Sequence, residues 1–383
     1  MAEMAEALIR ELFMRSYSLL EIRAVLFKDT GVEMSLRTLK RTLQKLGLRR
    51  RGAVDWNTLQ AAIMTEIEGS GQRLGCRMMV QRLLGSHGIS IGRDRVLRLM
   101  HTLDPEGVKM RTRHCLTRRQ YHNLGPNFLI HIDGYDKLKR YGLAIHGAIC
   151  GFSRKVLWLR VNRTNNDPNV VASYFINYIR KISGVPRCIR MDAGTENTTV
   201  INMQQALRWF HEDERSGEKS TIIGSSHSNQ RIEAWWRHLR QMCIGFWMDF
   251  FGDMDDQGLL STANDLHVEC LRFCFNGIIQ RELDQIRAEW NTHRVRHSAE
   301  HTLEGKPDLL YHYPELFGAS DFRYPVAESD IDELELFTTK PPEFGCLDNC
   351  AEHFQQLMGN HGKEMPRTCL DAKSLYLWLI QYV

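Results

Sequence analysis

Two short apolar runs that each end in an aspartate constrain the fold of this chain most. They are Phe128–Asp133 and Cys188–Asp192, and their aspartates lie 59 positions apart. Runs of this length and composition predict buried β-strands. Between them, Asp167 followed by Pro168 predicts the start of a helix. A strand, a helix and a second strand in this order indicate an α/β domain.

The surrounding periodicity extends this pattern in both directions. Further strands are predicted at Leu143–Cys150, Lys155–Val161 and Thr221–Ile223, and further helices at 199–210 and 229–247. Three strands, a helix, a strand, a helix, a strand and a helix form the plan of a ribonuclease-H-like domain. The sequence therefore predicts a mixed five-stranded sheet with flanking helices.

Three carboxylates in this plan are candidates for metal-dependent chemistry. Asp133 and Asp192 end their predicted strands, and Glu233, 41 positions after Asp192, lies near the start of a later helix. Converging there, they can hold two Mg²⁺ or Mn²⁺ ions about 3.5–4 Å apart for an in-line phosphoryl displacement. A single aspartate at a strand end is commonly a cap or turn residue, and Asp136 and Glu196 are the competing acids.

The front of the chain predicts two all-α helix-turn-helix-like units, residues 1–52 and 53–105, followed by a basic linker at 106–124. In the first unit, Ser18 and Glu21 form a predicted capping box. The third predicted helix of this unit, which begins after Ser35, carries basic residues on one face. Three further arginines follow this helix in the sequence. The candidate DNA-binding residues are Arg37, Lys40, Arg41, Lys45, Arg49, Arg50 and Arg51. A protein-binding bundle with a solvated basic face is the alternative; DNA is favoured because the charge concentrates on the candidate recognition helix.

The net charge of +4 is too small to support nucleic-acid binding by itself, so the clustering of basic residues in the first third carries that argument.

The ten cysteines indicate reduced thiols, and with no signal or membrane-spanning run we expect an intracellular, nuclear protein. Zinc ligation near the C-terminus is not predicted, because the spacings fit no common finger and buried or incidental thiols explain them. The residues considered were Cys346, Cys350, His353, His361 and Cys369.

Successive motifs in the middle of the chain, over about residues 120–310, resemble the integrase-core-domain proteins of animals and fungi. These are transposon-derived relatives of retroviral integrases and of insertion-sequence transposases. The motifs are Gly125–Asn127, His131–Leu138, Ile145–Gly147, Gly151–Arg154, Asn165-Asn166, Arg190–Asn197, Asn229–Arg237 and Trp290–His293 with Arg296. Leu74–Met79 and Ile91–Val96 also resemble the segment that precedes the catalytic core in insertion-sequence transposases.

By position, the resemblance implies that Asp133, Asp192 and Glu233 are the catalytic, metal-binding DDE triad. It also implies that Arg237 and Arg240, on the helical face of Glu233, bind DNA phosphates where retroviral integrases have lysines. Members act as multimers on DNA, so a homo-oligomer is expected. There are two departures. The second gap of the triad is longer, with the extra residues expected in the polar stretch 211–220, and the retroviral His-His-Cys-Cys zinc module is absent from the sequence.

The remaining regions are less informative. A catalytic core at 125–300 is followed by a C-terminal region at 301–383, in which 319–343 is expected to be a loose acidic connector and 345–383 a small helical cap. Three interpretations of function remain. The leading one is a DNA integrase or transposase that cleaves 3′ ends and transfers strands. The others are a domesticated DNA-binding protein without catalysis and a nuclease without strand transfer.

Overall fold

The computed structural model describes residues 2–49, 52, 54–105, 108, 123–224, 229–296 and 303–382. It divides into two compact units, which are described separately. Unit 1 comprises Met1–Arg118 with Thr292–Val295, and unit 2 comprises Arg119–Asn291 with Arg296–Val383. None of the helices in the described ranges combines the length and the apolar character that a membrane span needs.

Unit 1 is helical, as predicted. Its helices are α1 (Ala2–Met14), α2 (Leu19–Thr30), α3 (Leu36–Lys45), α4 (Trp56–Ile67), α5 (Cys76–His87) and α6 (Arg93–Leu103), with a 3₁₀ turn at Ser70–Arg73. Within each trio, α1 to α3 and α4 to α6, every helix contacts the other two. The predicted capping box of Ser18 and Glu21 begins α2, and the Ser35 hydroxyl accepts a hydrogen bond from the Thr38 amide at the start of α3.

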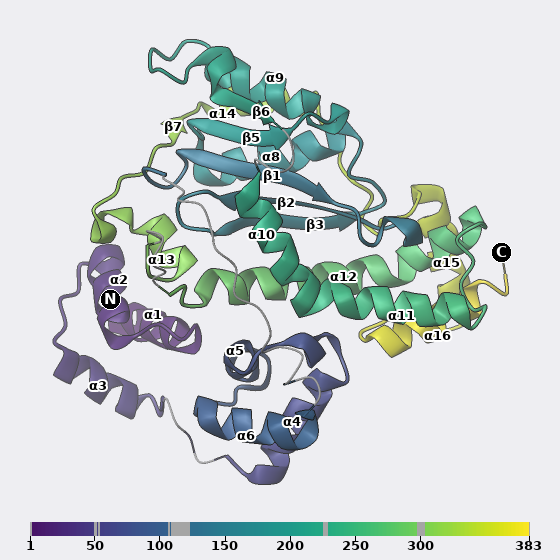
Figure 1. The fold of residues 1–383 in the computed structure, drawn as a ribbon, viewed down its shortest axis with the longest axis horizontal. Coiled ribbons are helices and arrows are strands. Elements are labelled where there is room, and N and C mark those ends of the chain that lie inside the picture. The colour runs from purple at the N-terminus through teal and green to yellow at the C-terminus, as the bar shows by residue number, and fades with distance from the viewer. Residues whose placement is uncertain are drawn as a thin grey trace. The chain divides into compact units, whose positions relative to one another are not determined.

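Unit 2 is built on a mixed five-stranded sheet with flanking helices, which confirms the predicted fold class (Figure 1). The strands are β1 (Leu129–Tyr135), β2 (Ala144–Cys150), β3 (Val156–Asn162), β5 (Cys188–Asp192) and β6 (Thr221–Gly224). Their order is β3-β2-β1-β5-β6. The first three strands pair antiparallel, and β5 pairs parallel with both β1 and β6.

Helices cover both faces of this sheet. They include α8 (Pro168–Ile182), α9 (Thr198–Leu207), α10 (Gln230–Leu239), α11 (Gly245–Asp256) and α12 (Asp265–Thr292), with a π-helical turn at Arg240–Ile244 between α10 and α11. Figure 1 shows α8 behind the sheet and α10 crossing in front of β1 and β2. The alternate residues Ile130 and Ile132 of β1, with Ile189 and Met191 of β5, pack into the core against α8. The opposite alternation therefore points Asp133 and Asp192 to the α10 face.

The outer edge of β3 is covered by side chains of α12. The Gln280 amide donates to the Leu159 carbonyl (3.1 Å) and accepts from the Val161 amide (3.0 Å). The Asn291 side chain bonds both the N–H (2.8 Å) and the C=O (2.9 Å) of Val156. These side-chain amides take the place of a neighbouring strand and satisfy an edge that would otherwise be open to pairing.

The acidic segment after the core is ordered, so the expectation of a loose connector at 319–343 was wrong. Following α13 (Pro307–His312) and a 3₁₀ turn at Pro314–Phe317, β7 (Tyr324–Pro325) pairs with β4 (Gly184–Val185), and α14 (Glu328–Glu335) packs on α8. The predicted helical cap at 345–383 is confirmed by α15 (Asp348–Asn360) and α16 (Cys369–Leu379).

Arg180 holds the acidic helix α14 against α8. Arg180 of α8 forms ion pairs with Glu328 (2.6 Å), Asp332 (2.6 Å) and Glu335 (3.0 Å) of α14, and Ile331 is fully buried. The acidic composition thus reflects a complementary partner on α8 rather than solvation.

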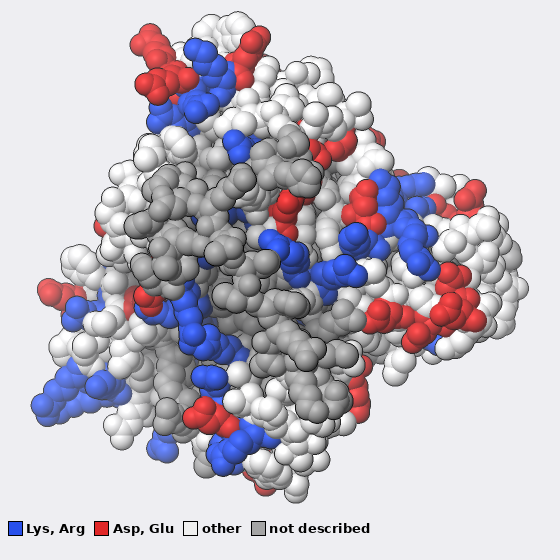
Figure 2. All heavy atoms as spheres, viewed as in Figure 1, with Lys and Arg blue, Asp and Glu red and all other residues white. Residues whose placement is uncertain are grey.

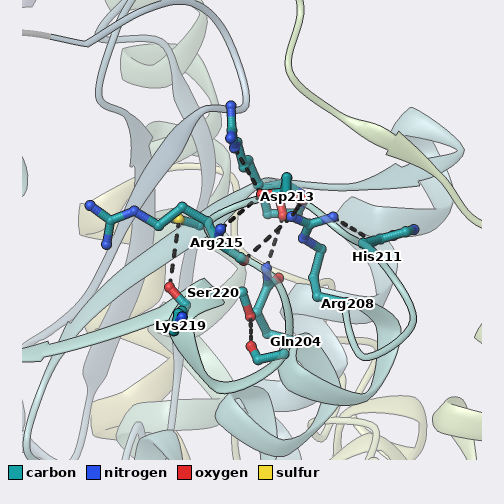
Figure 3. A network of polar contacts seen from close by, with 11 residues as sticks. Gln204, Arg208, His211, Asp213, Arg215, Lys219 and Ser220 are labelled. Atoms are coloured by element: carbon teal, nitrogen blue, oxygen red, sulfur yellow. Dashed lines mark hydrogen bonds and ion pairs between the residues drawn. The ribbon is translucent and has the colours of Figure 1, made fainter.

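The polar stretch after α9 is also ordered. Residues 208–220, here called the excursion, fold around the buried side chain of Arg208 (Figure 3). The Arg208 guanidinium donates hydrogen bonds to the Asp213 carboxylate and to the Arg215 carbonyl. Asp213 also accepts from Arg187 at 3.1 Å. The sequence predicted extra residues at 211–220, and in the structure this stretch is held by the ion pair between buried Arg208 and Asp213.

Candidate active site

The two aspartates lie side by side at the ends of neighbouring parallel strands. The printed register of β1 and β5 pairs Leu129 with Cys188 and His131 with Arg190, an offset of 59 positions. Continued by two residues, the same offset brings Asp133 opposite Asp192. The spacing noted in the sequence is thus the register of the sheet, and both carboxylates are half-buried.

Glu233 reaches this face from the first turn of α10. The helix contacts both β1 and β2, and Glu233 is half-buried. Its amide donates to the carbonyl of Asn229 (3.2 Å), the residue at the N-cap position. The Asn229 side chain in turn bonds His131 and Ile132 of β1, so the start of α10 is attached next to Asp133.

Trp236, one turn after Glu233, is part of the same arrangement. Its indole N–H donates to Oδ2 of Asp133 (2.8 Å), and its ring stacks on Tyr135 with the ring centres 4.9 Å apart. Gly147 lies opposite Asp133 in β2. A larger residue would not fit there, because its Cβ would lie 2.8 Å from the Trp236 indole. The tryptophan is buried, and its indole also orients the first acid.

Burial and charge make Asp133 unusual among the acids. Its pKa is raised to about 7, chiefly by desolvation and further by the neighbouring charges of Asp192 and Glu233, against the lowering effect of the Trp236 hydrogen bond. The three carboxylates therefore act on one another electrostatically, although they come from separate elements. Burial lowers the pKa of His131 to about 3, so this histidine is neutral at physiological pH.

Within the described ranges, no three His, Cys, Asp or Glu side chains are grouped tightly enough to hold a metal ion as they stand. The donor set nevertheless fits Mg²⁺ or Mn²⁺, which prefer hard carboxylate oxygens. Like charges at close range repel one another, and a divalent cation removes that repulsion. Burial first, and then this repulsion, raise the pKa of Asp133.

The two competing acids have other partners. Asp136 is exposed, with one oxygen on Lys139 (2.9 Å) and the other on the Asn165 amide (2.7 Å). Glu196 is linked to Asp192 through the side-chain amide of Asn197. This amide donates to the Glu196 carboxylate at 3.3 Å and to the Asp192 carboxylate at 3.0 Å. Asp136 is thus engaged in a surface ion pair, while Glu196 lies beside the site.

The candidate DNA-binding residues are distributed over both units. Arg237 and Arg240 of α10 and the following turn are exposed, and Figure 2 shows basic side chains lying over α10. In unit 1 every described candidate is exposed, namely Arg37, Lys40, Arg41, Lys45 and Arg49, and Lys45 pairs with Glu6 at 3.2 Å. Arg50 and Arg51 lie outside the described residues.

Comparison with known families matches residues 120–312, half of the chain, to the family described as integrase core domain. The chain belongs to the integrase core domain family. Integrase core domains are the catalytic cores of integrase- and transposase-like DDE proteins, which typically transfer nucleotidyl groups, generally use divalent metal ions and generally bind DNA. A comparison with curated proteins finds no match.

Several motifs of this integrase core domain are structural. Asn127 of the Gly-Pro-Asn motif accepts from the hydroxyls of Tyr178 (2.6 Å) and Tyr311 (2.8 Å), and its amide donates to Asp321 (2.7 Å). Asn291 covers the edge of β3. The roles of Asn229 and Trp236 toward the acids were missed from the sequence, although both residues lie within recognised motifs. Their partners are 97 and 103 positions away, beyond any local pattern.

Proposed function

We propose that this chain is a metal-dependent polynucleotidyl transferase that cleaves the 3′ ends of a DNA element and joins them to target DNA. In this proposal Asp133, Asp192 and Glu233 are the catalytic residues and the ligands of Mg²⁺ or Mn²⁺. The observation that supports it most is the meeting of Asp133 and Asp192 on one sheet face, with α10 joined to that face by the Trp236 hydrogen bond.

The proposal gives each part of the site a task. Bound divalent ions would neutralise charge on the transferring phosphoryl group and acidify the attacking hydroxyl. Trp236 holds the Asp133 carboxylate in one orientation. Arg237 and Arg240, exposed on the helix that carries Glu233, would bind the DNA backbone through charge-assisted hydrogen bonds.

The front of the chain would recognise the DNA ends. The trios α1–α3 and α4–α6 correspond to the proposed units 1–52 and 53–105, with α3 as the basic helix that enters a groove. The proposed division continues with a linker at 106–124, a catalytic core at 125–300 and a C-terminal region at 301–383. We expect a homo-oligomer, because two DNA ends must be joined in one reaction.

The test compares the wild-type protein with Glu233→Gln. Each is incubated with Mn²⁺, a plasmid and labelled oligonucleotides carrying candidate end sequences. Joined products are expected with the wild type and are expected to fall by at least 10³-fold in the variant, with DNA binding preserved. Cleavage without joining would identify a nuclease. Binding without any Glu233-dependent product would identify a domesticated DNA-binding protein and reject the transferase.

A further inference from the structure

We propose that Asn229 is a positioning residue that holds Glu233 against Asp133, by attaching the first turn of α10 to β1 through both groups of its side-chain amide. The inference rests on the proposed function, since it assigns a task within that site. It concerns a residue that contributes no charge of its own.

The attachment consists of three consecutive hydrogen bonds. Asn229 Nδ2 donates to the carbonyl of Ile132 (3.0 Å), and Asn229 Oδ1 lies 2.6 Å from His131 Nδ1. The Glu233 amide then donates to the Asn229 carbonyl (3.2 Å), which closes the first turn of α10. The two residues before Asp133 are thereby connected to the turn that carries Glu233.

The hydrogen-bond directions require an asparagine side chain. The Ile132 carbonyl can only accept, so the nitrogen of the Asn229 amide must face it and the oxygen must face His131. His131 then carries its proton on Nδ1 and donates. Aspartate could not donate to Ile132. Serine has one shorter hydroxyl in place of two separate amide atoms, so it lacks the reach to bond both groups of β1 as Asn229 does.

The position also departs from the ordinary use of asparagine at a helix start. An N-cap asparagine normally accepts a hydrogen bond from an amide in its own first turn. Asn229 stands at the N-cap of α10 and makes no such side-chain bond, and it is only 1% exposed. Its amide is turned away from its own helix toward the strand, so helix capping is given up for the connection to β1.

A connection of this kind is needed because the three acids repel one another. Like charges close together repel one another, and Asp133 and Asp192 lie at the ends of neighbouring strands with Glu233 on the helix that packs on the first of them. A helix free to move would carry Glu233 outward. Residues that orient metal ligands typically change metal affinity by about 10–100-fold when they are replaced.

The experiment measures Mn²⁺ affinity by calorimetry in the full chain, with thermal unfolding alongside. Asn229→Ala is compared with Asn291→Ala, a matched control in which a buried asparagine also bonds a strand backbone with both amide groups, but at the far edge of β3. We expect about 10-fold or more weaker Mn²⁺ binding in Asn229→Ala. We expect less than about 2-fold change in Asn291→Ala, although both variants unfold at lower temperature.

A second variant separates positioning from helix stability. Asn229→Ser supplies a side chain that can cap α10 itself but cannot replace both bonds to β1. It should recover much of the unfolding temperature while binding Mn²⁺ as weakly as the alanine variant. With DNA present, kcat should fall and KM for DNA should stay within about 2-fold, because the attachment acts on the acid and not on the DNA surface.

The Glu233→Gln background tests the route of the effect. If Asn229 acts through Glu233, adding Asn229→Ala to Glu233→Gln should weaken Mn²⁺ binding by less than about 2-fold. An undiminished effect in that background, or equal affinity of Asn229→Ala and the wild type, overturns the inference alone. A wild-type protein that binds no Mn²⁺ overturns the proposed function, and the inference with it.

Discussion

At the scale of single residues, Asp133 is the position where the proposed function and the stability of the fold oppose each other. Burial raises its pKa to about 7 from an ordinary value of 3.8, so the folded protein binds this proton more tightly than the unfolded chain. The stability associated with the protonated acid is fully present below about pH 4 and is lost as the pH rises through 7. At pH 8 the folded state carries an unfavourable buried charge.

Asp133→Asn should therefore stabilise the protein at high pH in the absence of divalent ions. The amide remains neutral and can still accept the Trp236 hydrogen bond. We expect roughly 2 kcal/mol, or about 5 °C in unfolding temperature, at pH 8 in EDTA, and almost no difference at pH 4. Thermal unfolding from pH 4 to 8 measures this, with Asp253→Asn, an exposed acid of α11, as the control. A stabilisation that does not grow between pH 4 and 7 would contradict it.

The residue scale also shows how far the sequence reaches. The placement of Asp133 and Asp192 at neighbouring strand ends could be predicted, because strand ends are local features of the sequence. The spacing between the two aspartates equals the strand register. The hydrogen bond from Trp236 and the attachment by Asn229 could not be predicted, since each joins elements about a hundred positions apart. Gly147 was recognised within a motif, but only the indole above it explains why the residue is a glycine.

At the scale of elements, local chemistry predicted most helices and strands, and tertiary contacts decided the exceptions. The helix that begins at Pro168 was predicted from its cap, and it begins there. The π-helical turn at Arg240–Ile244 was not predicted, because one widened turn hardly alters the apolar periodicity. The acidic composition of 319–343 predicted a loose connector, because the partner of its acids, Arg180, lies on a helix far away in the sequence.

The excursion at 208–220 allows a prediction at this scale. Arg208 is fully buried and its guanidinium lies 3.8 Å from the centre of the Tyr324 ring. Burial alone would raise the pKa of Asp213, but hydrogen bonds from Arg208 and Tyr324 lower it well below its ordinary value. Asp213→Asn should destabilise the protein by about 3 kcal/mol, since it leaves a buried cation without its counter-charge.

Urea unfolding of the double variant tests the ion-pair explanation. Arg208→Met with Asp213→Leu removes both charges and should cost less than Asp213→Asn alone, because no buried charge remains unpaired. The stability from Asp213 is present above pH 4 and is lost as the pH falls below it, so the wild type and Asp213→Asn should converge in acid. Purely additive losses in the double variant would reject the explanation.

At the scale of the whole molecule, the proposed function assigns recognition of the DNA ends and metal chemistry to different parts of the chain, so the two should respond to different substitutions. The acids lie in unit 2, whereas the basic residues of α3 lie in unit 1. Family membership covers residues 120–312 and therefore does not reach α3. The assignment of α3 to DNA depends on its exposed basic face and on the trio of helices that carries it.

Replacing Lys40 and Arg41 by alanine should weaken DNA binding without changing Mn²⁺ affinity. Each basic side chain that neutralises a phosphate displaces counterions, so the slope of log affinity against log salt should become less steep by about 2. Fluorescence anisotropy between 50 and 300 mM salt measures the slope, with Arg23→Ala, an exposed basic residue of α2, as the control. If the double variant keeps the wild-type slope while Arg237→Ala reduces it, DNA is held at the catalytic unit alone, and the assignment of α3 to DNA is rejected.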